Sequence, residues 1–86
     1  MHENLIICKS ITYAQRISRI LQYAGIGNQI TRIPTRLVKS GCGYGVRVRA
    51  DWLDEALSEI KKENMHPIAV FERNENGYHE VAYDLS

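Results

Sequence analysis

The sequence predicts an α+β fold in which two helices cover one face of an antiparallel sheet: a ferredoxin-like β-α-β-β-α-β sandwich with an added C-terminal β-strand. Two stretches with apolar residues at helical spacing alternate with short runs rich in β-branched residues, and turn residues separate them. The 86 residues suffice for one hydrophobic core. We therefore expect a single domain over residues 1–86.

The first half of the chain supplies a strand, a helix and a second strand. Residues 5–8 form a continuous apolar run, which is typical of a strand buried on both faces at the centre of a sheet. Ser10 can cap a helix that we expect over residues 11–24, and Gly25 ends it. A second strand is predicted over residues 28–33, because the proline that follows it prevents a helix through the junction.

The second half repeats the pattern and adds a strand. Residues 44–50 alternate valine with arginine, as in a strand with one wet face. Asp51 is expected to cap a second helix with an apolar stripe over residues 53–60 that ends near residue 64. The last two strands are predicted over residues 68–72 and 78–83, joined by an Asn-Glu-Asn-Gly turn.

Composition and charge narrow the class of protein. No run approaches the roughly 18 apolar residues of a membrane helix, and the N-terminus does not read as a leader, so we expect a cytoplasmic protein. Residues 1–50 carry eight Lys or Arg against one carboxylate, and residues 51–86 carry nine carboxylates against three Lys or Arg. This asymmetry favours mutual neutralisation on a compact surface over a dedicated anion-binding face.

The segment most suggestive of chemistry is rich in glycine and contains one of the two cysteines. Cys42 lies in it, and a glycine-rich loop can expose the residue that it carries. The rest of this supporting loop is Ser40, Gly41, Gly43, Tyr44 and Gly45. The thiolate is the reactive form of cysteine, and Arg36, Lys39, Arg47 and the first helix N-terminus are candidates to stabilise it. Alternatively, the glycines serve a tight turn or bulge and the thiol is incidental.

The other cysteine, Cys8, ends the first predicted strand. Such a cysteine usually packs in the core, and a role as a second thiol is the minority alternative. In the expected strand order, the loop between the second and third strands lies at the same end of the sheet as the first helix N-terminus. Cys8, Lys9 and Ser10 would then lie near Cys42. With two cysteines, both read as free thiols, the chain is not a disulfide scaffold.

The same segment carries a resemblance to a known family. Pro34, Leu37, the Ser-Gly-Cys-Gly core at residues 40–43 and the strand Tyr-Gly-Val-Arg at residues 44–47, set after a β-α-β start, resemble the selenium/sulfur (Se/S) carrier protein-like family of small bacterial domains. The resemblance covers residues 5–70, and in it the family's cysteine and partner glycine correspond to Cys42 and Gly43.

The resemblance implies a carrier and not an enzyme. The Cys42 thiolate would attack a persulfide or selenopersulfide on a donor protein, such as a cysteine desulfurase, and pass the chalcogen to an acceptor. This chemistry requires no metal or organic cofactor. Protein donors and acceptors are the expected partners, and a homodimer through an edge strand is a further option.

Two other classes of function remain open from the sequence. One is a regulatory module that binds a small molecule or a protein without thiol chemistry. The other, less favoured, is an RNA-binding domain, because Gly43-Tyr44-Gly45 opens the third strand of a ferredoxin-like fold but no further aromatic residues follow in that strand. The three histidines are scattered without ligand spacing, so we expect no metal site.

Overall fold

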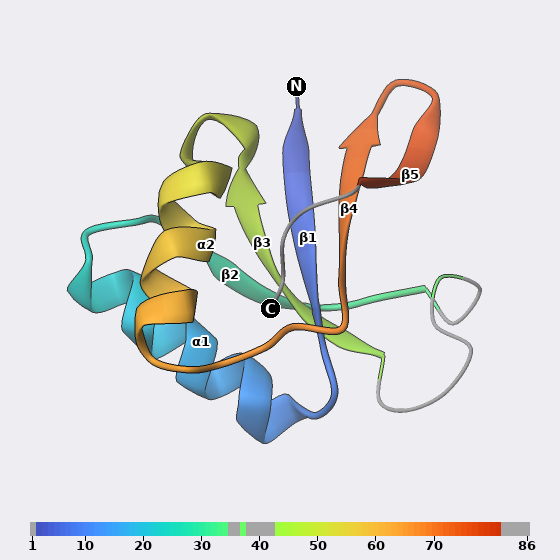
Figure 1. Cartoon of the computed structure of the whole chain (residues 1–86). Coiled ribbons are helices and arrows are strands. Elements are labelled where there is room, and N and C mark those ends of the chain that lie inside the picture. The colour runs from blue at the N-terminus through green and yellow to red at the C-terminus, as the bar shows by residue number, and fades with distance from the viewer. Residues whose placement is uncertain (1, 35–36, 38–42, 82–86) are drawn as a thin grey trace.

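The fold is built on five strands and two α-helices along the part of the chain that is described. The computed structural model describes residues 2–34, 37 and 43–81. In chain order the elements are β1 (Glu3–Cys8), α1 (Ile11–Tyr23), β2 (Gln29–Arg32), β3 (Tyr44–Arg49), the short 3-10 helix η2 (Ala50–Trp52), α2 (Leu53–Lys62), β4 (Ala69–Asn74) and β5 (Gly77–Val81) (Figure 1). The predicted order of elements is confirmed.

The strands form a single sheet in the order β2-β3-β1-β4-β5, and every neighbouring pair is antiparallel. The first four strands in this order have the ferredoxin-like arrangement, and β5 extends the sheet beyond β4. β1 is the central strand, and its residues 4–8 are all buried. This confirms the prediction for the continuous apolar run, which is explained by a central strand that is covered on both faces.

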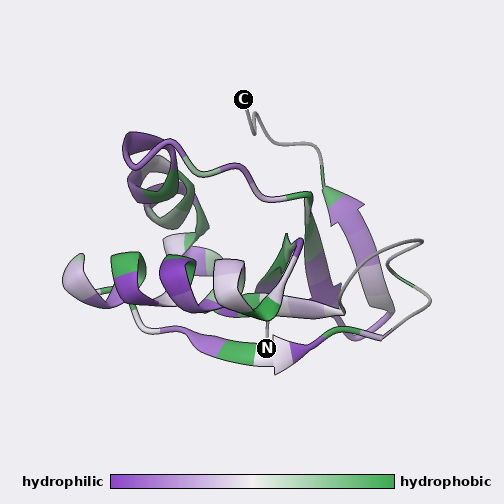
Figure 2. Cartoon of the chain, turned by 90° about the horizontal axis from the view of Figure 1, so that it is seen from below, coloured by the Kyte–Doolittle hydropathy of each residue, from purple (hydrophilic) through white to green (hydrophobic). Residues whose placement is uncertain are grey.

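The two faces of the sheet are covered differently. Figure 2 shows both helices on the same side of the sheet. Between the sheet and the helices lies the main core, in which Ile6, Val46 and Val70 from the strands meet Ile17 and Ile60 from the helices. The opposite face, called the open face below, carries a smaller cluster of Leu5, Ile7 and Ile33, against which Leu37, Ala69, Phe71 and Tyr78 pack.

The helix ends follow the sequence in α1 and differ from it at α2. Ser10 caps α1, since its Oγ accepts a hydrogen bond from the Tyr13 backbone N–H at 3.1 Å, and Gly25 follows with a φ of +77°. The prediction that Asp51 caps the second helix is wrong. A 3-10 turn begins at Ala50, so Asp51 lies inside that turn, and its carboxylate pairs with Arg49 at 3.3 Å.

The observed strands are shifted slightly from their predicted bounds. β2 is shorter than expected, and β4 begins one residue later and runs to Asn74. The turn into β5 is as predicted: the Asn74 side chain accepts a hydrogen bond from the Asn76 N–H at 2.8 Å, and Gly77 has a φ of +106°. Residues 82 and 83 of the last predicted strand lie outside the described residues.

Candidate functional site

The predicted site lies between β2 and β3, and the structure describes part of it. Gly43, Tyr44, Gly45, Arg47 and Cys8 are described. Cys42 itself lies outside the described residues, together with Arg36, Lys39, Ser40 and Gly41. The geometry of the site is therefore built from the residues that flank this segment.

Hydrogen bonds and packing fix the two flanks. The Ile33 N–H donates to the carbonyl of Gly43 at 2.5 Å, which extends the β2–β3 pairing by one step toward the loop. The Leu37 N–H donates to the carbonyl of Pro34 at 2.9 Å. The side chains of Ile33 and Leu37 belong to the open-face cluster with Leu5 and Ile7 of the central strand. The flanks are thus anchored to the open face where β1 ends.

Close backbone approach explains two of the glycines. A Cβ on Gly43 would lie 2.9 Å from the carbonyl oxygen of Ile33, and one on Gly45 would lie 2.8 Å from that of Ile6 and 2.9 Å from Cδ1 of Ile33. Neither glycine has a positive φ. Because they lack a Cβ, Gly43 and Gly45 allow the backbone of Ile33 and Ile6 and the side chain of Ile33 to approach β3 closely. Sequence reasoning, which considered turn and bulge conformations, missed this role.

Tyr44 lies on the helix-covered side of the sheet. It pairs with Cys8 across β1 and β3, and its ring packs against the main core. The Arg32 guanidinium lies 5.4 Å from the centre of the Tyr44 ring. RNA-recognition sheets present their stacking aromatics on the open face, and in β3 that face carries Gly45 and Arg47. The Gly-Tyr-Gly sequence therefore does not form a stacking platform.

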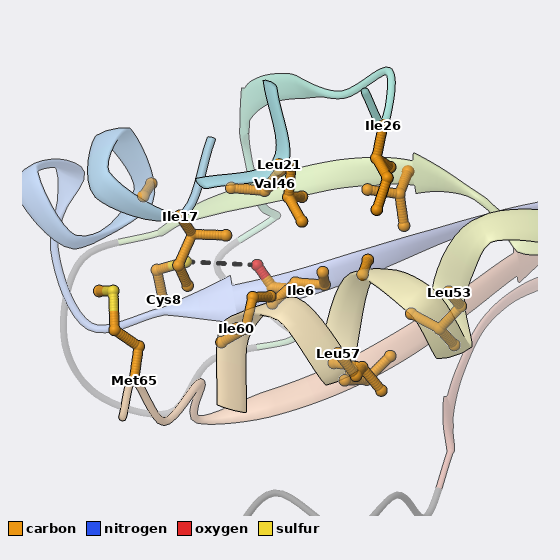
Figure 3. Packing of buried hydrophobic residues seen from close by; sticks show 14 residues of the cluster. Ile6, Cys8, Ile17, Leu21, Ile26, Val46, Leu53, Leu57, Ile60 and Met65 are labelled. Atoms are coloured by element: carbon orange, nitrogen blue, oxygen red, sulfur yellow. Dashed lines mark hydrogen bonds between the residues drawn. The ribbon is translucent and has the colours of Figure 1, made fainter. Parts of the chain in front are cut away.

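Cys8 is buried beneath the helices. Its side chain is 0% exposed, and its Sγ donates a hydrogen bond to the Ile6 carbonyl at 3.5 Å (Figure 3). Desolvation by burial raises the pKa of the Cys8 thiol from 9.0 to about 12. At neutral pH this thiol is protonated and shielded. Its position at the end of β1 is the predicted one, but the environment is that of a packing residue.

Arg47 contacts Glu3 and Gln29, at a distance from the start of β3. Its Nε lies 3.5 Å from Oε2 of Glu3, and its guanidinium donates to Oε1 of Gln29. Arg73 approaches the same Glu3 oxygen at 3.7 Å, so two arginines share one carboxylate on the open face. Arg47 lies three residues into the strand, roughly 10 Å from Tyr44 at the rise of an extended chain. Its guanidinium is therefore part of an ion cluster nearer the far end of the sheet.

Lys9, which the sequence places near the candidate loop, and three residues that sequence reasoning did not assign to the site lie around the end of β1. The ammonium of Lys9 lies 4.7 Å from the centre of the Tyr13 ring, and the Tyr13 hydroxyl accepts a hydrogen bond from the His66 N–H. The N–H of Ile68 donates to the carbonyl of Ile7 at 2.9 Å. These contacts join the start of α1 to the segment that leads into β4. The contact between Lys9 and Tyr13 is local, but only the tertiary structure reveals the contacts of His66 with Tyr13 and of Ile68 with Ile7, because these residues are far apart in the chain.

A groove lies between the two helices, apart from this end of the sheet. It has a volume of about 450 Å³ and is lined by Arg16, Arg19, Ile20, Tyr23, Ala24, Glu59 and Glu63.

Among residues 2–34, 37 and 43–81, no three His, Cys, Asp or Glu side chains are grouped so that they could hold a metal ion. In the same part of the chain, no helix is long and apolar enough to cross a membrane.

The family model described as "Putative Se/S carrier protein-like" matches residues 3–72. The chain belongs to this family. The match extends from the first residue of β1 into β4 and includes Cys42 and both anchored flanks. No curated protein and no solved structure matches the chain. Membership of the Se/S carrier protein-like family confirms the resemblance identified from the sequence.

Proposed function

We propose that this Se/S carrier-like protein holds sulfur or selenium as a terminal persulfide or selenopersulfide on Cys42 and passes it from one protein to another. The observation that carries the proposal is the state of the other thiol. The chain has two cysteines, and Cys8 is fully buried with a pKa of about 12. A carrier needs an accessible thiolate, so within this family member the role falls to Cys42.

The transfer balances without a cofactor. The Cys42 thiolate attacks the outer sulfur of a cysteine persulfide on the donor, a new S–S bond forms, the donor's S–S bond breaks, and the donor cysteine leaves as a thiolate. Unloading repeats the step with the acceptor's thiolate as nucleophile. The transferred sulfur keeps its oxidation state, so neither an oxidant nor a reductant is consumed. The protein acts as a carrier and not as an independent enzyme.

The cytoplasm, with its reduced thiols, suits this role, and we propose it as the location. Proteins that generate persulfides, such as cysteine desulfurases, are the proposed donors. The described residues on either side of the segment support the proposal, because Ile33 is hydrogen-bonded to Gly43 and both Ile33 and Leu37 pack on the open face where β1 ends.

The test is the intact mass of the purified protein after incubation with cysteine and a cysteine desulfurase. We expect one additional sulfur atom in the wild type and in Cys8→Ser, and none in Cys42→Ser. Cys8→Ser is the matched control, because it removes the other thiol by the same substitution. A sulfur adduct that persists in Cys42→Ser, or its absence from the wild type, contradicts the proposal.

A further inference from the structure

One end of the sheet brings three separate segments together. β1 ends, β3 and β4 begin and α1 starts at this end, because β1 is antiparallel to both β3 and β4 (Figure 1). We call it the loop end and define it by the described residues 8–13, 32–34, 37, 43–44 and 65–69. Gly43, which directly follows Cys42 in the sequence, belongs to it.

Two large apolar side chains are exposed at the loop end. Ile11, the first residue of α1, is 36% exposed, and Ile68, which precedes β4, is 51% exposed. Both are held by ordered backbone. Ser10 caps the first turn of α1, and Ile68 is bonded to the end of β1 through its N–H. Two exposed isoleucines at the same end of the sheet can supply the apolar centre of a protein interface, which is depleted of charged residues.

The described residues of the loop end carry charge of one sign. They include Lys9 and Arg32 and no Asp or Glu. Lys9 is exposed and lies over the Tyr13 ring. The carboxylate that comes next along the chain before residue 65, Glu63, lines the groove between the helices with Arg16. The complementary surface is therefore one that carries carboxylates.

We infer that the loop end is the surface on which the persulfide-donating protein docks, through Lys9, Ile11 and Ile68, and that the donor presents carboxylates around an apolar centre. The inference rests on the proposed function, because it names the partner surface that serves Cys42. Opposite charges at the rim increase the rate of encounter and orient the partners, while the isoleucines lose water on contact. Transient complexes commonly bury less than about 1,200 Å², and a surface of these few residues suits a partner that must leave after transfer.

The test compares two docking variants with two matched controls. Lys9→Glu reverses one charge at the loop end, and Arg16→Glu reverses one charge in the groove between the helices. Ile68→Glu places a charge on an exposed apolar position at the loop end, and Tyr23→Glu does so on α1, where Tyr23 is 88% exposed. With a cysteine desulfurase carrying its persulfide, we expect sulfur loading to slow by about tenfold in both docking variants and to stay within about twofold in both controls.

A second sulfur donor distinguishes a defect in docking from a defect in sulfur binding by Cys42. Inorganic polysulfide needs no protein surface, so the final extent of loading on Cys42 after prolonged incubation should be equal in all five proteins. If polysulfide loads all proteins and the desulfurase loads the docking variants as fast as the wild type, the docking inference is overturned and the carrier proposal stands. An equal loss in the controls also overturns it. Failure of both donors to load wild-type Cys42 contradicts the carrier itself. Should Ile68→Glu fail to fold by circular dichroism, Ile11→Ser and Ile68→Ser provide the same comparison.

Discussion

At the residue scale, burial determines the protonation of Cys8. Its thiol is held protonated in the fold, with a pKa of about 12 against 9.0 for an accessible thiol. A raised folded-state pKa means that the folded protein keeps a proton that the unfolded chain gives up. The stability associated with Cys8 is therefore complete below pH 9 and is lost as the pH rises toward 12, with a slope of at most about 1.4 kcal/mol per pH unit.

This dependence predicts how a Cys8 variant compares with the wild type. At pH 7 we expect Cys8→Ala to be less stable by about 1–2 kcal/mol, because it removes buried atoms from the core. Between pH 9 and 11 the difference should shrink, since only the wild type loses the contribution of the protonated thiol. Urea unfolding of both proteins at each pH measures it. A constant difference up to pH 11 would show that Cys8 is not desolvated in the folded state.

Gly45 offers a second prediction at this scale. Gly45→Ala places a methyl group 2.8 Å from the carbonyl oxygen of Ile6, in the central strand, where the backbone cannot move away. We expect the free energy of unfolding to fall by about 1–3 kcal/mol. Gly27→Ala is the control, because nothing lies within 4 Å of its Cβ position and its φ is not positive; its stability should be unchanged or higher by about 0.5 kcal/mol. Equal stability of the two variants would contradict the steric explanation.

At the scale of elements, the sequence predicts most of what is local and little of what depends on contacts. Helical periodicity, the Ser10 cap and the buried run of β1 suffice to predict the elements and their order, because each is encoded within a few residues. The 3-10 turn around Asp51 is closed by a local hydrogen bond from the Leu53 N–H to the Ala50 carbonyl, and residue type alone does not distinguish it from a helix cap. The reason for Gly45 could not be predicted, since it depends on the backbone of Ile6 far away in the chain. The same is true of the contact between Tyr13 and His66.

Part of the candidate site was likewise predictable. A glycine-rich segment with one cysteine is visible in any reading of the sequence, and the resemblance to the Se/S carrier protein-like family rests on its residues. The anchoring of the described residues beside that segment is a tertiary property. From the sequence Leu37 is one of several residues between two strands, and only the tertiary packing shows that it lies against the cluster of Leu5, Ile7 and Ile33.

The packing of Leu37 on the open-face cluster leads to a prediction about stability and local hydrogen exchange. Leu37→Ala removes part of the contact with the open-face cluster, so we expect a loss of stability of about 1 kcal/mol, as for a half-buried leucine. Faster hydrogen exchange at the Leu37 and Ile33 amides should accompany it, because both donate hydrogen bonds at the flanks of the loop. Exchange that speeds up equally at Ile6 and Val46 in the core would indicate global destabilisation and would contradict a local anchor.

At the scale of the whole molecule, the cationic side chains have different contacts at the two ends of the sheet. Away from the loop end, arginines meet carboxylates: Arg47 of the first half and Arg73 of the second half approach Glu3, and Arg49 of the first half approaches Asp51 of the second. Mutual neutralisation, the outcome favoured from composition, is seen there. At the loop end, Lys9 and Arg32 instead lie over aromatic rings. Exposed ion pairs add little stability, so this arrangement matters more for association than for folding.

The last prediction follows from this polarity. If a protein donor is attracted to the loop end, loading of the wild type by a desulfurase should slow by about tenfold when the ionic strength rises from about 0.02 to 0.5 M, because salt screens charges that are separated by more than the Debye length. Lys9→Glu should respond less to salt. Alkylation of Cys42 by iodoacetamide, a neutral reagent, reports the reactivity of the thiol without docking and should change little over the same range. Equal salt dependence of loading in wild type and Lys9→Glu would show that attraction to this end does not limit transfer, whereas a parallel fall in alkylation would attribute the effect to the thiol itself.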